Sequence, residues 1–583
     1  MRSDTPYGRL LLTFGLLLAL VSCNNDSTVA DDSCQRTGNE LIIRQQVEPD
    51  RLNPLLTSSG YANQINQLIF LTLETLDPEN LELAPMLIKQ RPAVETTESG
   101  GMRFTFDILE EASWDDGSPI TAHDYVFTVK TSLHPGLNAD RYRPYIGIIS
   151  SIDIDPDNPK HFTVTTRDQD QLGEEFVSNV LMIMPEYHYD PNGLLRDIPL
   201  EAFADEAQLK AHTTALEDFA AQFSDQRLSR EADGVIGGGP YRLESWETGQ
   251  RVNLVKKDNW WGEDLVDDYP ALDAYPDRIS FQLVADGATA VAVVQGEEID
   301  MVPELDVESF VRLENDSLVQ ACYNMESFPQ LVRSFLSLNT RSPKLADKRV
   351  RRAIALSIDV EEVIRDLYQG FGDRINGPVP PSVAFANKKL ALLDYDPEQA
   401  KNLLTEAGWE DTNGNGTVDK TINGTLTEME LSFEIPAGRE STQQLGLLLK
   451  EQMQAAGIGL EIEPGDWNEI MGRHRSGDFE IVPMGRTFPS PTVWNPRQNY
   501  HSQGDNRTGF GNAETDALID RILTTFDERE RYDLYRELQG IIYEEQPEIF
   551  LFAPRARIAI HKRFETPLIP IAPGFLPNLV KLK

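Results

Sequence analysis

The sequence predicts an α/β fold that divides into more than one domain, and three observations support this prediction. With 583 residues, the chain is longer than one hydrophobic core usually serves. Segments with the two-residue alternation of strands and segments with the periodicity of helices follow one another along the chain. Residues 103–130 combine both patterns, because an alternating segment, a turn and an apolar helical segment occur there in direct succession.

The stretch 103–130 shows how each kind of element is recognised. Phe104, Phe106 and Ile108 alternate with polar residues, which predicts a half-buried strand. Residues 115–119, DDGSP, predict a turn, because glycine accepts positive φ and proline cannot donate to a ladder. Thr121 and Asp124 have the spacing of a capping box, which predicts that a helix begins here.

Other elements are expected by the same criteria. The expected strands and hairpins are 41–43, 150–166 and 458–462, and the expected helices are 64–76, 201–223, 347–359, 396–408 and 443–453. Asp396 fits the N-cap of its helix, Pro397 the first helical position and Gly408 the left-handed position after the end. The clustered Arg and Lys residues of the helix at 347–359 are expected to form its solvated face or local pairs with Asp347 and Glu361.

The charge balance excludes one class of partner. The chain has 94 acidic and 53 basic residues and a formal net charge of -41. Nucleic-acid phosphates attract patches of lysine and arginine, so the composition argues against a nucleic-acid partner. The preferred interpretation of the acidity is solubility and mutual repulsion between copies, and a field that attracts cationic ligands is the alternative.

Residues 1–23 are expected to be a signal peptide. Arg2 and Arg9 provide a positive segment, and the apolar run 10–21 is too short to span a bilayer. The following Leu-Val-Ser-Cys resembles the bacterial lipobox, which identifies Cys23 as the lipidated first residue of the mature chain. Residues 24–40 are then a polar tether, and the protein is expected to be a lipoprotein of the cell envelope, facing the periplasm or the cell exterior. A cleaved signal with an incidental cysteine is the alternative.

Two further cysteines, Cys34 and Cys322, leave two alternatives open. A disulfide is allowed in a protein outside the cytoplasm. Two free buried thiols fit the sequence equally well, because sequence alone does not show whether the Cα atoms come close enough.

The motif Trp-x-Asp-Gly-x-Pro-Ile-Thr-Ala-x-Asp at residues 114–124 resembles the signature of the family 5 extracellular solute-binding proteins. These are the oligopeptide and dipeptide receptors of bacterial ABC importers. Further segments resemble the family in the same order, namely GGGPY at 237–241 with NWW at 259–261, SLNT at 337–340 with DKRVRRAIALSID at 347–359, and DPEQAKNLLTEAGW at 396–409. The resemblance extends from residue 41 to the C-terminus.

The resemblance implies a periplasmic-binding-protein-like (type II) fold with two lobes and an additional baseplate domain. The expected division is lobe I at 41–76, 236–325 and 549–583, the baseplate at 77–235 and lobe II at 326–548. The region near 186–235 is longer than the family suggests, and a solvated helical hairpin without assigned function is expected there.

The function that the resemblance implies is capture of a peptide or peptide-like ligand between the lobes and delivery to an ABC permease, by a monomer without a cofactor. Related alternatives are a non-peptide solute such as a sugar or a metal chelate. A surface-tethered hydrolase is the alternative from another class. The sequence contains no His-Glu-x-x-His, Gly-x-Ser-x-Gly or P-loop motif, and its eight histidines are scattered, so no enzyme is expected.

The candidate ligand site is the run at 484–491. In peptide-binding relatives the corresponding backbone pairs with the ligand, and an aspartate there holds the peptide amino group. Phe488 fits this pattern and Gly485 allows close approach, but Thr487 replaces the aspartate and Arg486 precedes it. On a strand, Arg486 faces either solvent or ligand, and both remain open. Further aromatic candidates are Trp467, Trp494 and Tyr61.

The loop at 411–419, DTNGNGTVD, resembles a calcium loop with Asp411, Asn413, Asn415 and Asp419 as oxygen ligands. Ile422 stands where the bidentate acidic ligand belongs, so a polar hairpin turn is the preferred interpretation and a weak calcium site the alternative.

Overall fold

The computed structural model describes residue 34 and residues 36–488 and 493–583. The expected signal peptide, Cys23 and the tether up to residue 33 lie outside the described residues. Within the described ranges, no helix has both the length and the apolar character needed to cross a membrane.

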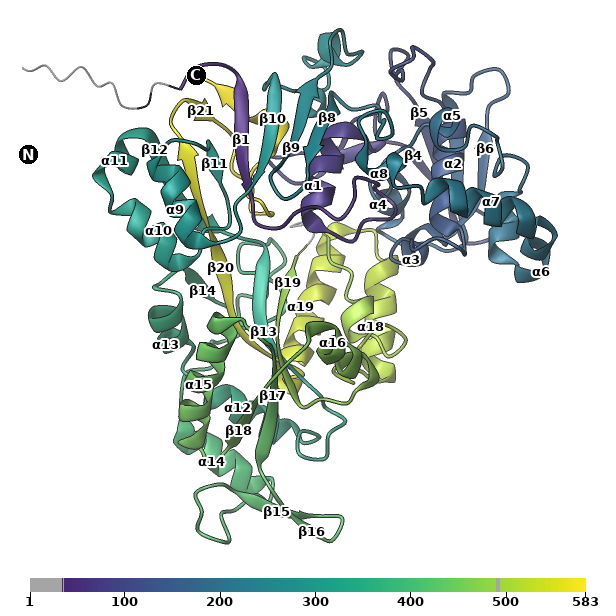
Figure 1. Cartoon of the computed structure of the whole chain (residues 1–583). Coiled ribbons are helices and arrows are strands. Elements are labelled where there is room, and N and C mark those ends of the chain that lie inside the picture. The colour runs from purple at the N-terminus through teal and green to yellow at the C-terminus, as the bar shows by residue number, and fades with distance from the viewer. Residues whose placement is uncertain (1–33, 35, 489–492) are drawn as a thin grey trace, which may run out of the picture.

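One large sheet runs through both lobes (Figure 1), in the order β18-β17-β19-β13-β20-β11-β1-β10-β9-β8. The lobe I strands are β1 (Glu40–Gln45), β8 (Tyr241–Glu247), β9 (Arg251–Lys256), β10 (Arg278–Leu283) and β11 (Met301–Val302). The lobe II strands are β13 (Val332–Leu338), β17 (Glu430–Pro436), β18 (Gly459–Gly465) and β19 (Ile481–Thr487). The 14-residue strand β20 (Glu548–His561) belongs to both lobes.

The lobes are joined where β20 changes partners. Its first residues pair with β13, and residues from Arg555 onward pair with β12 (Tyr323–Pro329). Between these two regions, Pro554 pairs with the short strand β14 (Gly372–Arg374) and accepts a hydrogen bond from the N–H of Gln330 at 3.2 Å. The chain therefore crosses between lobes at residues 329–332 and 553–555.

The baseplate is a separate sheet with the order β4-β5-β7-β6. Its strands are β4 (Ala93–Thr96), β5 (Met102–Asp107), β6 (Ile149–Ile154) and β7 (His161–Thr166), and its helices include α2 (Ala122–Leu133), α3 (Arg143–Ile146), α4 (Gly173–Ser178), α5 (Glu186–Tyr189), α6 (Glu206–Leu209), α7 (Thr213–Phe223) and α8 (Arg227–Arg230). Its buried residues form one continuous cluster with those of lobe I around α1 (Gly60–Ile69).

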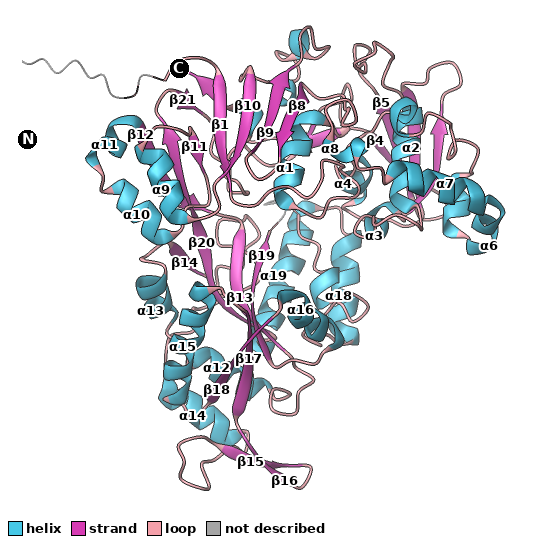
Figure 2. Cartoon of the chain, viewed as in Figure 1, coloured by secondary structure: helices cyan, strands magenta, loops and turns pink. Residues whose placement is uncertain are grey.

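Helices cover both faces of the lobe II sheet (Figure 2). One face packs against α12 (Lys348–Leu356), α14 (Pro397–Glu406) and α15 (Glu440–Gln454). The other packs against α16 (Trp467–Ser476), α17 (Arg497–Tyr500), α18 (Ala513–Thr524) and α19 (Glu528–Glu545). In lobe I, α9 (Gly287–Gln295), α10 (Val307–Glu314) and α11 (Ser317–Cys322) enclose a further cluster. The short hairpin β15–β16 (Asp419–Ile422, Thr425–Glu428) lies at the far tip of lobe II.

Most predicted elements are confirmed, and three differ. The capping box of Thr121 and Asp124 is present, and Gly408 has φ of 84° after α14. The helix expected at 64–76 is shorter, because α1 ends at Ile69 and the chain enters β2 (Glu74–Leu76), which pairs with β3 (Leu83–Pro85). The region 201–223 is interrupted, since Asp205 caps a new short helix, α6.

The third difference is Arg351 of α12, which was expected to face solvent. Its side chain is 3% exposed and donates to the carbonyl oxygens of Leu345, Ala346 and Glu545. Arginine provides several donors at once, so one buried side chain can satisfy three carbonyl groups from two places in the chain.

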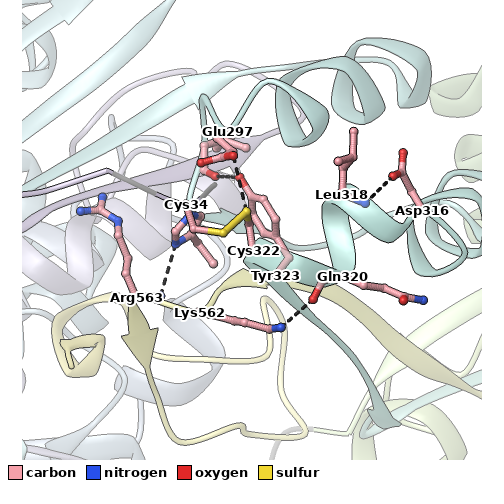
Figure 3. The surroundings of a disulfide bond; sticks show 11 residues. Cys34, Glu297, Asp316, Leu318, Gln320, Cys322, Tyr323, Lys562 and Arg563 are labelled. Carbon is pink, nitrogen blue, oxygen red and sulfur yellow. Dashed lines mark hydrogen bonds between the residues drawn. A yellow bond between two sulfur atoms is a disulfide. The ribbon is translucent and has the colours of Figure 1, made fainter. Parts of the chain in front are cut away.

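Cys34 and Cys322 form a disulfide, with an S–S distance of 2.06 Å and a Cα–Cα distance of 5.3 Å (Figure 3). The bond links the beginning of the described chain to the end of α11, 288 positions away. Lys562, just after β20, donates its backbone N–H to Cys322 O at 2.8 Å. Of the two alternatives that the sequence left open, the structure contains the disulfide.

Candidate ligand-binding site

Strand β19 has an open backbone edge at the junction of the lobes. It pairs with β13 along its whole length, from Val332 opposite Thr487 to Leu338 opposite Ile481. On its other edge, β17 meets it only at Ile481, so no strand of the described chain lies beside residues 482–487. Apart from Gly485 and its two chain neighbours, no described residue has a heavy atom within 4 Å of the position that a Cβ would occupy at Gly485.

The end of β19 lies against both lobes. Phe488 donates its N–H to Leu331 O at 2.6 Å, and Leu331 donates its own N–H to Pro570 O at 2.7 Å. Pro570 belongs to the C-terminal segment that follows the lobe I end of β20. The open edge of β19 therefore lies beside the crossing between lobes.

Two arginines lie directly opposite each other on β13 and β19. Arg333 pairs in register with Arg486, and side chains of directly opposed residues share one face of a sheet. The Cζ atoms of Arg333 and Arg486 lie 5.3 and 5.8 Å from the centre of the Phe335 ring. Arg333 is 2% exposed, whereas Arg486 is partly buried.

One carboxylate lies beside this arginine pair. Glu548, at the start of β20 opposite Ser337, is 3% exposed. Its Oε2 lies 3.8 Å from Nη2 of Arg333 and accepts a hydrogen bond from the Tyr500 hydroxyl at 2.5 Å. Burial, reinforced by the negative charge of Glu548, raises the pKa of Tyr500 well above its ordinary value, so Tyr500 remains a neutral donor.

Arg486 lacks such a partner within the described chain. Its Nη1 atom is buried without a hydrogen bond, and no carboxylate of the described residues lies within ion-pair distance. Burial lowers the pKa of Arg486, although Glu548 acts in the opposite direction. The cluster of Arg333, Arg486 and Glu548, here called the arginine cluster, thus combines two cations with one anion.

His474 of α16 packs behind the arginine cluster as a neutral side chain. It is 2% exposed, and its Nε2 lies 2.9 Å from Ser337 Oγ, while its Nδ1 is buried without a hydrogen bond. Burial, with Arg507 and Arg486 nearby, lowers the pKa of His474 to about 4. A cavity of about 10 Å³, the size of one water molecule, is lined by His474, by the cations Arg486 and Arg507 and by the carboxylates Asp505 and Glu548, among others.

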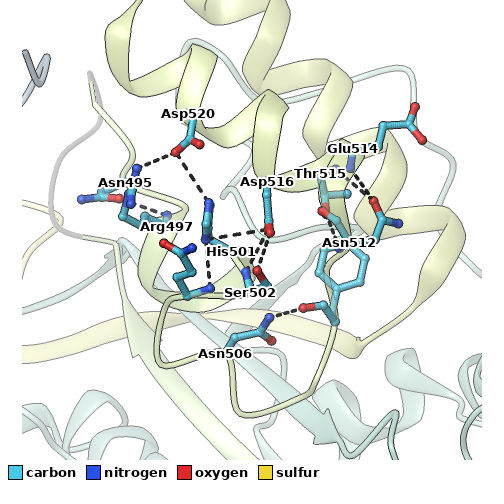
Figure 4. Close-up of polar contacts among 12 residues, drawn as sticks. Asn495, Arg497, His501, Ser502, Asn506, Asn512, Glu514, Thr515, Asp516 and Asp520 are labelled. Atoms are coloured by element: carbon cyan, nitrogen blue, oxygen red, sulfur yellow. Dashed lines mark hydrogen bonds and ion pairs between the residues drawn. The ribbon is translucent and has the colours of Figure 1, made fainter.

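Hydrogen bonds fix the segment 495–512 (Figure 4), and part of this segment lines the small cavity beside Arg486. His501 is 4% exposed, and its Nδ1 accepts from the N–H of Gln503 at 3.0 Å, which leaves Nε2 to face Asp520 at 3.6 Å. The Ser502 hydroxyl donates to Asp516 and not to His501. This arrangement lacks the serine–histidine hydrogen bond that a hydrolytic triad requires.

The structure distributes the predicted site residues over different environments. Gly485 and Thr487 are exposed on the open edge of β19. Phe488 and Trp494 are 1% and 3% exposed and pack within the aromatic core of lobe II. They therefore stabilise the end of β19 and are not available to contact a ligand directly. Trp467 begins α16 and is 39% exposed.

Tyr61 lies on lobe I, where its hydroxyl donates to Glu304 Oε2 at 2.7 Å. Arg333, Glu548 and Tyr500 were missed in the sequence. For Arg333 and Glu548 the sequence did contain a signal, because each is a charged residue in an otherwise apolar strand, VRSFLSL and EIFLF. Charged residues are rarely fully buried unless they are paired, so the two strands could have been expected to contribute a pair.

A larger cavity of about 1220 Å³ lies elsewhere. Its walls come from α1, residues 72–91, 268–275 and 565–581. These belong to lobe I, the baseplate and their connections, and none of the predicted ligand-binding residues lines it. A ligand in this cavity would not bridge the two lobes, so we place the candidate site at β19.

The loop at 411–419 forms a hydrogen-bonded turn. Asp411 accepts backbone N–H groups of residues 414, 415 and 416, and Asp419 accepts from Thr412. The side-chain amides of Asn413 and Asn415 donate to Glu428 at 3.1 and 2.8 Å. The side-chain oxygens of Asn413 and Asn415 accept the backbone N–H groups of Asn415 and Thr417 at 3.0 and 2.9 Å, so they hold the turn.

Comparison with known proteins agrees with this architecture. Residues 56–508 match the sequence model of the bacterial extracellular solute-binding proteins, family 5 Middle. The chain belongs to this family.

Two proteins of known structure and one curated sequence illustrate the similarity. The chain is 22% identical to the oligopeptide-binding protein AppA of Bacillus subtilis, covering 97% of this chain and 96% of that protein. The structure of AppA from Bacillus subtilis in complex with a nonapeptide has a TM-score of 0.71 at 20% identity, covering 94% and 99% of the two chains. NikA from Brucella suis in complex with Fe(III)-EDTA has a TM-score of 0.73 at 18% identity, covering 93% and 100%. The predicted family and two-lobed α/β fold with a baseplate are confirmed.

Proposed function

We propose that this family 5 member is a receptor outside the cytoplasm that captures a peptide or peptide-like solute between its lobes and presents it to an ABC import permease. The open edge of β19 is the observation that carries the peptide assignment. An extended peptide can add to an exposed strand edge, and its backbone hydrogen bonds then give affinity whatever its side chains are. Gly485 leaves the space that such a neighbour needs.

Closure provides the signal to the permease. A ligand that contacts both lobes stabilises the closed state by its differential contacts. The baseplate also reaches lobe II here, because Gln171 donates its N–H to Leu523 O at 2.9 Å and its side-chain amide to the Tyr535 hydroxyl at 2.8 Å. These contacts would be broken when the lobes open about residues 329–332 and 553–555.

Small-angle scattering tests closure. A peptide that binds is expected to reduce the radius of gyration. It should be recovered intact afterwards, because Ser337, which lies 2.9 Å from His474 Nε2, is buried, and Nδ1 of His474 has no hydrogen-bond partner within the described chain. An unchanged radius at saturating peptide would contradict closure. Quantitative conversion of the peptide would assign the protein to the hydrolases instead.

A non-peptide solute remains the second candidate, because NikA was solved with an iron chelate. A metal chelate has no extended backbone to pair with β19, so the open edge favours the peptide.

The domain limits given above, a monomeric state and the absence of a cofactor belong to the same proposal.

The proposal includes a lipid anchor at Cys23. Replacing Cys23 with serine removes the acylated thiol, so we expect the variant to appear in the soluble fraction after cell lysis, whereas the wild type sediments with membranes. Immunoblotting of both fractions measures the distribution. Cys34→Ser makes the same chemical change eleven residues further along the chain, and this variant should stay with the membranes. A membrane-bound Cys23→Ser variant would contradict lipidation.

A further inference from the structure

We infer that Arg486 binds a carboxylate of the ligand, so that the receptor selects peptides or peptide-like acids that present a free carboxylate at β19. This inference rests on the proposed function, because it assigns the ligand chemistry of the same site.

The first argument is the uncompensated charge of the arginine cluster. Like charges directly opposite each other on neighbouring strands destabilise a sheet, and Arg333 and Arg486 are such a pair. Glu548 supplies one negative charge for the two arginines, although it also acts on Arg486. It lies 3.8 Å from Arg333 and already accepts the hydrogen bond of Tyr500.

The second argument is the unsatisfied donor of Arg486. Nη1 is buried without a hydrogen bond inside the described chain, and buried charges in proteins are normally paired. A water molecule in the adjoining cavity of about 10 Å³ would accept this hydrogen bond but would leave the charge unbalanced. A carboxylate satisfies both, because a guanidinium presents its donors in a fork that matches the two carboxylate oxygens.

The third argument is access from the open edge of β19. Arg486 is partly exposed and stands between exposed Gly485 and exposed Thr487, so a ligand that pairs with this edge passes beside it. Thr487 offers a hydroxyl and no charge, so it cannot neutralise an ammonium group. The charges at this point of the site therefore favour the carboxyl end of a peptide over its amino end.

Calorimetry with matched peptides tests the inference. The probes are trialanine with a free carboxylate, its C-terminal amide, and the N-acetyl forms of both. For the wild type we expect the acids to bind on the order of 10- to 100-fold more tightly than the amides, as hydrogen bonds to charged groups require. Acetylation of the amino end should change affinity far less. In Arg486→Gln, acid and amide should bind equally.

Arg475→Gln serves as the matched control, because Arg475 is an exposed arginine next to His474 on α16 and the substitution removes the same charge. This control should keep the preference for the acid. Equal binding of acid and amide to the wild type, or an unchanged preference in Arg486→Gln, would overturn the inference while leaving a peptide receptor intact.

Thermal unfolding of the ligand-free protein gives a second readout that needs no ligand. If Arg486 binds an anion of the ligand, it lacks a counter-charge in the ligand-free protein. Arg486→Gln then removes an uncompensated charge, and the Tm should stay equal or rise. A lower Tm would show that Arg486 has a structural role and would overturn the inference. If none of the four peptides binds the wild type, the peptide assignment fails, and the Tm comparison still decides the role of Arg486.

Discussion

Replacing Glu548 with glutamine should lower the free energy of unfolding by about 3 to 5 kcal/mol, the range found when one partner of a buried ion pair is removed. Glu548 is 3% exposed and is the anion beside Arg333, so the variant leaves two opposed arginines without a counter-charge. Glutamine keeps the shape and can still accept the hydrogen bond of Tyr500. Urea denaturation of both proteins measures the difference.

Two further variants separate charge from packing. Glu544→Gln removes an exposed carboxylate on α19, 3.9 Å from Arg352, and should change stability by less than about 1 kcal/mol. Combining Glu548→Gln with Arg486→Gln should recover part of the lost stability, because one of the uncompensated cations is then absent. A Glu548→Gln variant as stable as the wild type would contradict the charge balance described for the arginine cluster.

His474 should make the stability of lobe II depend on pH between about 6.5 and 4. The folded protein lowers the pKa of His474 to about 4, whereas an unfolded chain has the ordinary value of about 6.5. In this window the unfolded chain binds more protons, so the stability contribution is complete above pH 6.5 and is lost as the pH falls toward 4. The loss is about 3 kcal/mol for a shift of this size.

The measurement is the difference between the stability–pH profiles of the wild type and His474→Gln, since other titrating groups cancel in the difference. The wild type should lose more stability on acidification than the variant does. His123→Gln, which replaces an exposed histidine of the baseplate, serves as the matched control substitution. Parallel wild-type and His474→Gln profiles would show that His474 titrates normally in the folded protein.

Much of the fold could be predicted because its signals are local. The capping box at Thr121, the N-cap at Asp396 and the left-handed Gly408 each fix an element within a few residues of sequence. The helix expected at 64–76 failed for the opposite reason. The end of this segment forms β2, which pairs with β3. The pairing depends on residues 83–85, and these lie outside the segment whose helical periodicity was the basis of the prediction.

The candidate site was predictable only in part, because it is assembled from distant segments. The run at 485–488 could be located from its resemblance to the family, and Gly485 and Thr487 do lie on the open edge of β19. The partner of Arg486 across the sheet is Arg333, 153 positions earlier, and the counter-charge on Glu548 comes from β20. Strand register brings these three charges together, and register between distant strands is a property of the whole fold.

Native mass spectrometry of the protein, purified under mild conditions from its own host, tests the central claim most directly. We expect an added mass that dissociates intact and that fragments as a peptide with a free carboxyl end. Release of a metal chelate, a sugar or another solute without a peptide backbone would contradict the account.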